Sequence, residues 1–184
     1  MKYDYIASAI LLGLPNSGKT TFLNTYSNKQ KSDYATIGVD FNKFQLKYND
    51  NYYQLKLWDT GNGLLYRNII DDFLKKANIY IVINNNKKYD FINEIFEIIH
   101  YNNPQLIIFI YNKKIENDNF QYNENYIKNK NINILIQFFY IDVTKKNQVN
   151  QVFDFIKQYI NNLNNNKYNN TIIKQSKLSC CNIC

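Results

Sequence analysis

The sequence predicts an α/β fold: a six-stranded, mostly parallel sheet with one antiparallel strand and helices on both faces. Two observations lead to this prediction. Apolar runs alternate with helix-like segments along most of the chain, which is the pattern of a doubly wound parallel sheet. After the first run, two segments with alternating apolar and polar residues flank a turn. They predict a β-hairpin that supplies the antiparallel strand.

The expected elements follow in order along the chain. Four apolar runs are typical of buried parallel strands: 5–12, 79–83, 106–111 and 134–141. The hairpin strands are 41–48 and 52–58, joined by Asn49-Asp50-Asn51. Five segments are helix-like: 20–27, 66–76, 89–100, 122–130 and 145–161.

Length and composition exclude several classes of protein. A chain of 184 residues fits one domain, which we expect at 1–161, followed by a flexible polar tail at 162–184. No apolar stretch reaches the roughly 18 residues that span a membrane, and the first residues do not form a signal peptide. The lysines behind the net charge of +7 are scattered and arginine occurs once, so we expect no nucleic-acid partner. Weak attraction to an anionic membrane is the better use of that charge.

Residues 13–20 read G-L-P-N-S-G-K-T and directly follow the first apolar run, which predicts a phosphate-binding loop. Glycines at both ends let backbone N–H groups point at phosphates, Lys19 reaches the outer phosphates, and the Thr20 hydroxyl suits a phosphate-bound Mg²⁺. The alternative is a glycine turn that only joins a strand to a helix. The nucleotide-binding residues expected in this stretch are Gly13, Asn16, Ser17, Gly18, Lys19, Thr20 and Thr21.

Four further stretches occur where a nucleotide switch needs them. Thr36 precedes the hairpin and can place its hydroxyl on Mg²⁺. Asp59 ends the second hairpin strand, where it can hold the water shell of the metal. Asn112-Lys113 and Asp142-Val143-Thr144 follow two buried strands, at the carboxyl edge where open α/β sheets bind ligands.

Together these residues resemble the small GTPases of the Ras superfamily, and the Rab branch most closely. T-I-G-V-D-F at 36–41 has the Rab form of the first switch, and W-D-T at 58–60 begins the second. The resemblance covers about residues 5–160 and implies the P-loop small-GTPase fold, with GTP or GDP and Mg²⁺ as cofactors. It further implies nucleotide contacts from these positions: Thr36, Asp59, Asn62, Asn112, Lys113, Val143 and Thr144.

The same resemblance implies an effector-binding face. Phe41, Trp58 and Phe73 fall where Rabs carry an aromatic triad, and Ile37 belongs to the first switch beside it. The alternative for the three aromatic residues is ordinary packing between sheet and helix, and both roles can hold together.

The second switch departs from the family at its catalytic positions. Asn62 replaces the glycine whose N–H meets the γ-phosphate, and Gly63 replaces the glutamine that orients the attacking water. Pro15 stands close to where the γ-phosphate is expected and removes a backbone donor. With Lys19 retained and Gly63 unable to orient water, we expect hydrolysis that is slow or depends on an activator.

The base-reading motif departs as well. The family reads N-K-x-D, whereas residues 112–115 read N-K-K-I. Ile115 therefore occupies the position of the aspartate whose carboxylate accepts two N–H bonds from guanine in the family. Loss of both bonds weakens guanine binding by about a hundredfold or more. Glu116 is a less favoured substitute. In the last motif Val143 still offers a backbone N–H to the base, but the usual lysine is absent.

All three cysteines lie in the last five residues, so we expect no disulfide framework and a reducing compartment. Cys180 and Cys181 resemble a prenylation signal of the Rab type, and Cys181-Asn-Ile-Cys184 also fits C-a-a-X. Free thiols or part of a metal site are the alternative. Lipidation implies peripheral attachment to the cytosolic face of an endomembrane.

The sequence therefore predicts a Rab-like GTP/GDP switch in vesicle trafficking. By resemblance its partners are effector proteins, an exchange factor, a GTPase-activating protein and the prenylation and escort machinery. The alternative function is a pseudo-GTPase, a binding module that keeps the effector face but binds nucleotide weakly or without selecting guanine.

Overall fold

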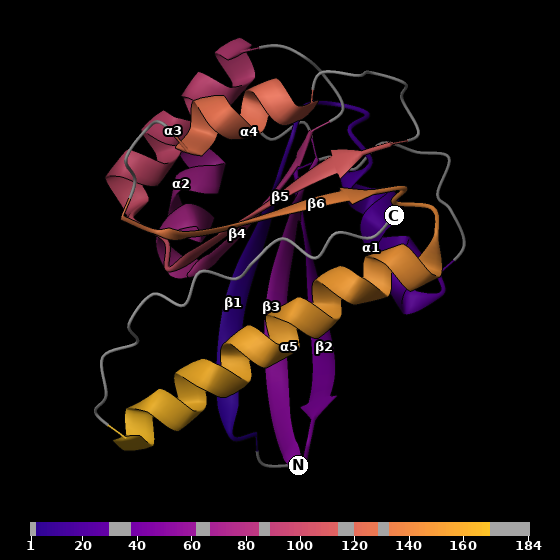
Figure 1. Ribbon diagram of the computed structural model, residues 1–184, viewed down its shortest axis with the longest axis vertical. Helices are drawn as coiled ribbons and strands as arrows, with labels where there is room; N and C mark the ends of the chain where they lie inside the picture. The colour runs from indigo at the N-terminus through magenta and orange to yellow at the C-terminus, as the bar shows by residue number, and fades with distance from the viewer. Residues whose placement is uncertain are drawn as a thin grey trace.

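A computed structural model describes residues 3–29, 38–61, 67–84, 89–113, 120–128 and 133–169. The strands form one six-stranded sheet in the order β2-β3-β1-β4-β5-β6, in which β2 is antiparallel to β3 and every other pair is parallel (Figure 1). This confirms the predicted fold class. The strands are β1 (Tyr5–Leu12), β2 (Val39–Tyr48), β3 (Asn51–Thr60), β4 (Ile79–Asn84), β5 (Leu106–Asn112) and β6 (Leu135–Ile141). The helices are α1 (Lys19–Ser27), α2 (Arg67–Lys76), α3 (Tyr89–Asn102), α4 (Phe120–Lys128) and α5 (Lys146–Asn169).

Helices cover both faces of the sheet and create two apolar layers. On one face, α1 and α5 pack on the sheet through residues such as Phe22 and Phe153, whose rings stack with centroids 5.4 Å apart. On the other face, α2, α3 and α4 pack through residues such as Leu74, Ile95 and Ile127. Figure 1 shows α5 crossing in front of the sheet and the group of α2, α3 and α4 on its other side.

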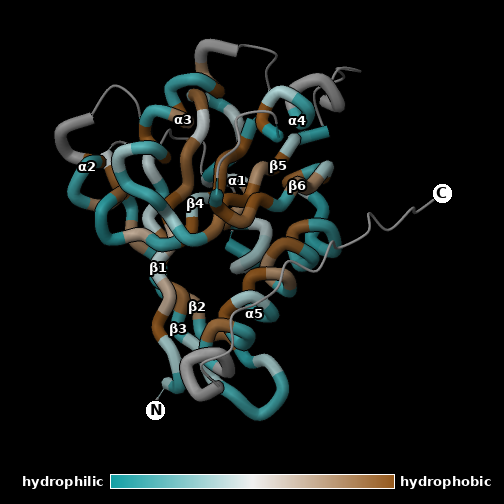
Figure 2. The backbone as a smooth tube through the Cα atoms, turned by 60° about the vertical axis from the view of Figure 1, so that its left-hand side comes forward, coloured by the Kyte–Doolittle hydropathy of each residue, from teal (hydrophilic) through white to brown (hydrophobic). Residues whose placement is uncertain are grey.

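The central strands explain why the sequence shows unbroken apolar runs there. Every residue of β4 and β5 is buried, because helices cover both faces of these two strands. The tube coloured by hydropathy shows hydrophobic residues concentrated in the strands at the centre (Figure 2). In β2 and β3, by contrast, side chains alternate between a buried face and a more exposed one, as the hairpin pattern predicts.

Helix α5 is longer than the sequence pattern indicates, since it ends at Asn169 rather than at residue 161. Two of its asparagines, Asn161 and Asn164, are buried against the sheet. The hydroxyl of the buried Tyr53 donates a hydrogen bond of 2.8 Å to Asn161 Oδ1, and Asn51 Nδ2 donates to the same oxygen at 3.3 Å. Polar residues on the inner face of α5 therefore hold the helix against the sheet, in a segment that the composition predicts to be a flexible tail.

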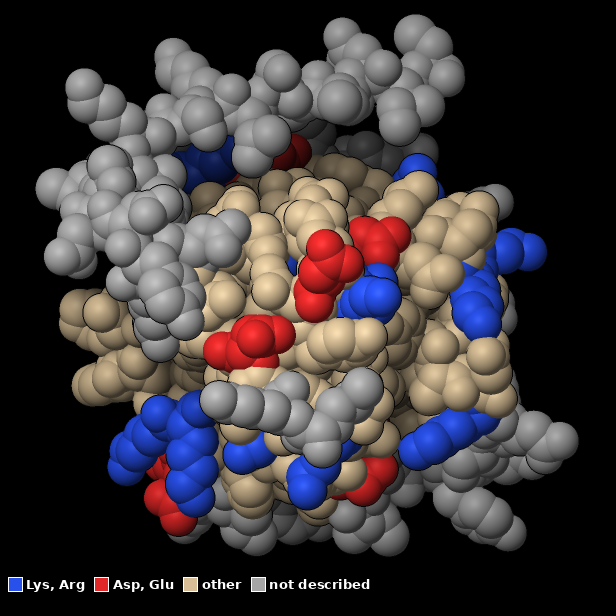
Figure 3. All heavy atoms as spheres, turned by 90° about the horizontal axis from the view of Figure 1, so that it is seen from below, with Lys and Arg blue, Asp and Glu red and all other residues tan. Residues whose placement is uncertain are grey.

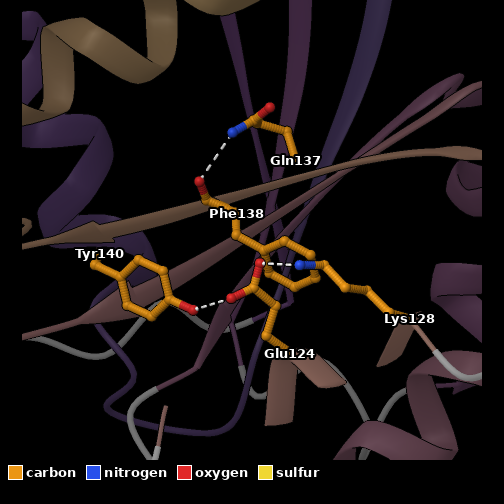
Figure 4. A network of polar contacts seen from close by, with 5 residues as sticks. All are labelled: Glu124, Lys128, Gln137, Phe138 and Tyr140. Atoms are coloured by element: carbon orange, nitrogen blue, oxygen red, sulfur yellow. Dashed lines mark hydrogen bonds and ion pairs between the residues drawn. The ribbon is translucent and has the colours of Figure 1, made fainter. Parts of the chain in front are cut away.

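The edge strand β6 is connected to α4 by a small polar network (Figure 4). Tyr140 Oη donates to Glu124 Oε2 at 2.9 Å, and Lys128 forms an ion pair with Glu124 at 2.8 Å. The Lys128 ammonium also lies 5.7 Å from the ring centroid of Phe138, while Gln137 Nε2 donates to the Phe138 carbonyl at 3.0 Å. These contacts fix α4 over the far edge of the sheet.

Charged side chains are distributed over the surface rather than gathered in one basic block. In the view from below, basic side chains lie at several separate places around the margin, and another lies beside the acidic side chains nearer the centre (Figure 3). Within the described ranges, no helix is both long and apolar enough to cross a membrane.

Candidate functional site

The candidate site lies at the carboxyl ends of the parallel strands. From β1 the chain passes to β2 and β3 on one side of the sheet, and later to β4 on the other side. The loop after β1 therefore occupies the point where the strand order reverses, which is the preferred ligand position in open α/β sheets. In the parallel register Leu11 lies opposite Asp59, so the end of β3 comes next to this loop and to the start of α1.

The two glycines of the phosphate loop are required by close packing. A Cβ on Gly13 would lie 2.5 Å from the Ile83 carbonyl oxygen and 2.6 Å from Ser17 Oγ. Gly18 has a φ of +104°, and its Cβ would lie 3.0 Å from both Asn112 Nδ2 and Val143 Cγ2. The glycine spacing therefore lets the loop approach β4 on one side and the ends of β5 and β6 on the other.

Lys19 folds back over the loop that precedes it. Its ammonium donates hydrogen bonds of 2.9 Å to the Gly13 carbonyl and 3.0 Å to the Leu14 carbonyl, and the residue is only 5% exposed. Burial lowers the pKa of the Lys19 ammonium, and the charge of Asp59 partly opposes this shift. A cation held in this way lies inside the loop, where an anion would compensate its lost hydration.

Thr20 and Asp59 meet beside Lys19. Thr20 Oγ1 donates a hydrogen bond of 2.7 Å to Asp59 Oδ2, and Asp59 is 1% exposed. Burial raises the pKa of the Asp59 carboxyl; the Thr20 hydrogen bond and Lys19 lower it, and Asp40 adds to the increase. The other carboxylate oxygen, Oδ1, and the hydroxyl of Ser17 are buried and have no hydrogen-bond partner among the described residues. The Asp59 carboxylate and the Thr20 hydroxyl thus lie side by side, and oxygen atoms of this kind are the ligands that Mg²⁺ prefers.

Asn112 connects the phosphate loop to the loop after β6. Its Nδ2 donates to the Ser17 carbonyl at 3.2 Å, and its Oδ1 lies 3.5 Å from the Val143 N–H. The Lys113 N–H donates to the Ile141 carbonyl at 2.9 Å, which keeps the ends of β5 and β6 together. The structure thus brings Asn112, Lys113 and Val143 next to the phosphate loop.

Asp142 has a structural role that its position after the last strand did not indicate. Its Oδ1 accepts hydrogen bonds from the Thr144 N–H at 2.8 Å and from the Thr144 hydroxyl at 2.6 Å, while its own N–H donates to Gln148 Oε1 at 2.7 Å. These contacts form a tight turn that leads into α5. The signal was present in the sequence, since aspartate two residues before threonine favours such a turn.

The three aromatic residues of the expected effector face are in contact. Phe41 lies opposite Trp58 in the hairpin register, with ring centroids 5.8 Å apart, and Trp58 lies 5.6 Å from Phe73 of α2. Trp58 is nearly buried, whereas Phe41 is 42% exposed. The row therefore combines packing between sheet and helix with an exposed aromatic surface.

Several expected site residues lie outside the part of the chain that the structure describes. They are Thr36 and Ile37 of the first switch, Asn62 and Gly63 of the second, Ile115 of the base motif, and Cys180 and Cys181 of the tail. Thr21 is described and lies half-buried in the first turn of α1, next to Thr20.

A family model and several known proteins are similar to part of this chain. Residues 9–116 match the family model for Roc, the "Ras of Complex" domain of DAPkinase. Ras-related protein Rab-11B of Dictyostelium discoideum is 30% identical over 87 residues, 46% of this chain and 40% of that protein. Ras-related protein Rab-3A of Homo sapiens is 30% identical over 94 residues, 50% of this chain and 40% of its own. The Ypt/Rab-type GTPase ypt7 of Schizosaccharomyces pombe is 32% identical over 94 residues, which are 48% of this chain and 46% of that protein.

The family model spans the phosphate loop and the strands β2 to β5. The chain spans less than half the length of each of these three relatives. The family model, however, covers more than half of the chain, from within β1 to just beyond β5. The chain therefore belongs to the Roc family of GTPase domains, within the Ras superfamily.

Proposed function

We propose that this protein is a Rab-like small GTPase that binds GTP or GDP with Mg²⁺ and acts as a molecular switch in vesicle trafficking. The observation that carries the proposal is the hydrogen bond from Thr20 to the buried Asp59, next to the Lys19 ammonium inside the phosphate loop. A cation and two oxygen ligands are thus grouped at one end of a glycine-bounded loop. Similarity to Rab proteins supports the proposed trafficking role.

Each side chain has a distinct part in binding. Lys19 exchanges its contacts with the loop carbonyls for contacts with the outer phosphates, and the N-terminal end of α1 adds the positive end of its dipole. Thr20 and Asp59 would hold Mg²⁺, Asp59 through water, with Thr36 as a further ligand. The bound ion would neutralise part of the phosphate charge. Asn112 keeps the phosphate loop in register with the base side of the site.

Hydrolysis is slow or needs an activator. Gly63 has no side chain to orient a water molecule, and Asn62 stands where a glycine N–H meets the γ-phosphate in relatives. Intrinsic turnover in this family is about 10⁻⁴ per second, and activating proteins raise it by up to about 10⁵-fold. A GTPase-activating protein that inserts its own glutamine would bypass the missing side chain.

Membrane recruitment completes the proposed switch. Lipid attached to Cys180 and Cys181 anchors the protein on the cytosolic face of an endomembrane, and two lipids hold it more firmly than one. Effector proteins bind the face formed by Ile37, Phe41, Trp58 and Phe73. An exchange factor and the prenylation and escort machinery are the other partners.

A pseudo-GTPase is the second candidate, and Ile115 is the observation that favours it. Without the carboxylate at that position, guanine loses two hydrogen bonds to a charged acceptor. Mass analysis of the nucleotide released by denaturing the purified protein separates the candidates. Stoichiometric GDP or GTP supports the switch, whereas an empty site, or adenine and guanine nucleotides in equal amounts, overturns it.

A further inference from the structure

Among the residues that the structure describes, helices cover one end of the sheet face opposite α1 and α5. There Ile10 and Trp58 belong to the apolar layer beneath α2, α3 and α4. Further along β1, β3 and β2, the outward side chains are exposed or half-buried, and Ile6 is 50% exposed. In Figure 1 these strands extend well below α2, α3 and α4. We call this region the open sheet face; its outward residues are Ile6, Ser8, Lys43, Gln45, Lys47, Tyr52, Gln54 and Lys56.

The open sheet face contains lysines that repel each other. Lys43 lies directly opposite Lys56 in the antiparallel register. Like charges at opposed positions destabilise a sheet. The ion pairs found among the described residues lie within α4 and α5, and they involve neither Lys43 nor Lys56. Lys47, two rows further along, adds a third positive charge to the same face.

An aromatic row lies directly beside the lysine pair. Phe41 and Trp58 occupy the next outward positions on the same two strands, and the Lys43 ammonium lies 5.5 Å from the ring centroid of Phe41. Phe73 extends the row, and the Lys76 ammonium lies 5.7 Å from its ring. The aromatic row, in which Phe41 is 42% exposed, is thus bordered by the ammonium groups of Lys43 and Lys76.

We infer that the open sheet face binds an acidic amphipathic helix of a partner protein. The carboxylates of this helix lie between Lys43 and Lys56, and its apolar side chains cover the exposed ring of Phe41. The inference deepens the proposed effector face and rests on that part of the proposed function alone. Charge complementarity determines the chemistry of the partner, because a carboxylate between the two ammonium groups removes their repulsion.

The spacing of the rows fits a helix that runs along the strands. Outward residues on one strand repeat about every 6.7 Å. Residues four apart on a helix are about 6 Å apart along its axis. An apolar residue over the aromatic row therefore places an acidic residue, four positions away, over the lysine row. In the following row Gln45 lies opposite Gln54, and these amides can pair with polar side chains of the same helix.

The test uses a designed helical peptide of about 20 residues, long enough to be helical in water. The peptide is alanine-based and repeats leucine and glutamate four positions apart. A matched peptide has lysine in place of glutamate, and vesicles of phosphatidylcholine with phosphatidylserine form a third probe. The full-length protein is compared with Lys43→Gln/Lys56→Gln and with the control Lys128→Gln/Lys157→Gln. The control removes the same charge from α4 and α5.

The wild-type protein and the control bind the acidic peptide alike, and the Lys43→Gln/Lys56→Gln variant binds it at least tenfold more weakly. The same variant melts at a higher temperature than wild type, because the repulsion between the lysines is gone. Weaker binding together with a higher melting temperature distinguishes a lost contact from a damaged fold.

Three results overturn the inference: no binding of the acidic peptide to wild type, equal binding of the lysine peptide, or binding of the anionic vesicles alone. Nucleotide content is measured on the same samples. An empty phosphate loop in a protein that still binds the acidic peptide contradicts the proposed switch and leaves the docking surface intact. Normal nucleotide content without binding of the acidic peptide contradicts the docking surface and leaves the proposed switch intact.

Discussion

The phosphate side and the base side of the candidate site are built on different principles. On the phosphate side, Gly13 and Gly18 are fixed by close approach of backbone and side chains, and Lys19 contacts two main-chain carbonyls. On the base side, Asn112 keeps its connecting contacts, but Ile115 replaces the side chain that reads guanine in relatives. In the proposed site, phosphate binding would rest on the loop backbone together with Lys19, whereas base selection would rest on a single carboxylate. A sequence can therefore lose the second without disturbing the first.

The largest effect is expected from Lys19→Ala, which removes the cation from the phosphate side. Each hydrogen bond to a charged group contributes about 1.5–3 kcal/mol, so affinity for Mg²⁺-GTP should fall by about a hundredfold or more. Isothermal titration measures the change. The surface variant Lys157→Ala is the control and should bind as wild type does. A loss of less than about threefold for Lys19→Ala would show that phosphate is bound elsewhere.

The next largest effect is expected from Ile115→Asp, which restores the missing carboxylate on the base side. Two hydrogen bonds from guanine should raise affinity for GTP by about a hundredfold and leave affinity for ATP unchanged. Competition between the two nucleotides for the purified variant gives the ratio. Ile115→Ala controls for removal of the isoleucine and should show no gain. An equal gain for both nucleotides would mean that the position does not contact the base edge.

A smaller effect, on stability, is expected from Gly18→Ala. The left-handed backbone costs a non-glycine residue about 1–2 kcal/mol, and the new Cβ also crowds Asn112 and Val143. Gly38→Ala is the matched control, because Gly38 also has a positive φ, +78°, but no other described residue has an atom within 4 Å of its Cβ position. Chemical denaturation should show Gly18→Ala as the more destabilised variant. Equal losses would mean that the two halves of the site are not in close contact at Gly18.

The smallest effect is expected from Asp59→Asn in the nucleotide-free protein. Burial raises the pKa of this carboxyl, so in the folded protein the charged form is disfavoured. As pH rises, the Asp59 carboxyl loses its proton at the ordinary aspartate pKa in the unfolded state but only at the raised pKa in the folded state. The free energy of unfolding of the wild-type protein therefore falls as pH rises from the ordinary pKa to the raised one. Asp59→Asn should remove that part of the pH dependence and stabilise the nucleotide-free fold by on the order of 1 kcal/mol.

The same substitution should weaken Mg²⁺-dependent nucleotide binding, which separates stability from function at this residue. Asp50→Asn removes an exposed carboxylate from the turn between β2 and β3, at the other end of the hairpin, and serves as the control. Denaturation curves over a range of pH test the prediction. An Asp59→Asn variant that is less stable than wild type at neutral pH would contradict the assigned cost of burying the charge.

Most of the fold could be predicted from the sequence, because it depends on apolar periodicity. The buried strands β4 and β5 are unbroken apolar runs, and the hairpin alternates as a half-covered sheet requires. The end of α5 could not be predicted in this way. Asn161 continues the helix through a hydrogen bond with Tyr53, a residue far away in the sequence, and composition carries no signal of that contact.

The candidate site was predictable where a motif has a local meaning. Lys19, Thr20 and Asp59 were expected together, and the parallel register of β1 and β3 brings them together. The open sheet face was not expected, because the pairing of Lys43 with Lys56 depends on the hairpin register. Neither lysine belongs to a recognisable motif, so only the structure reveals the pair.

We propose that the protein binds guanine nucleotide through the phosphate loop while selecting guanine weakly. Titration of the nucleotide-free wild-type protein with GTP and with ATP, both with Mg²⁺, tests it directly. We expect that both nucleotides bind, that Lys19→Ala weakens both, and that GTP keeps a modest advantage through the Val143 N–H. Failure of either nucleotide to bind, or equal affinity for the two, would contradict it.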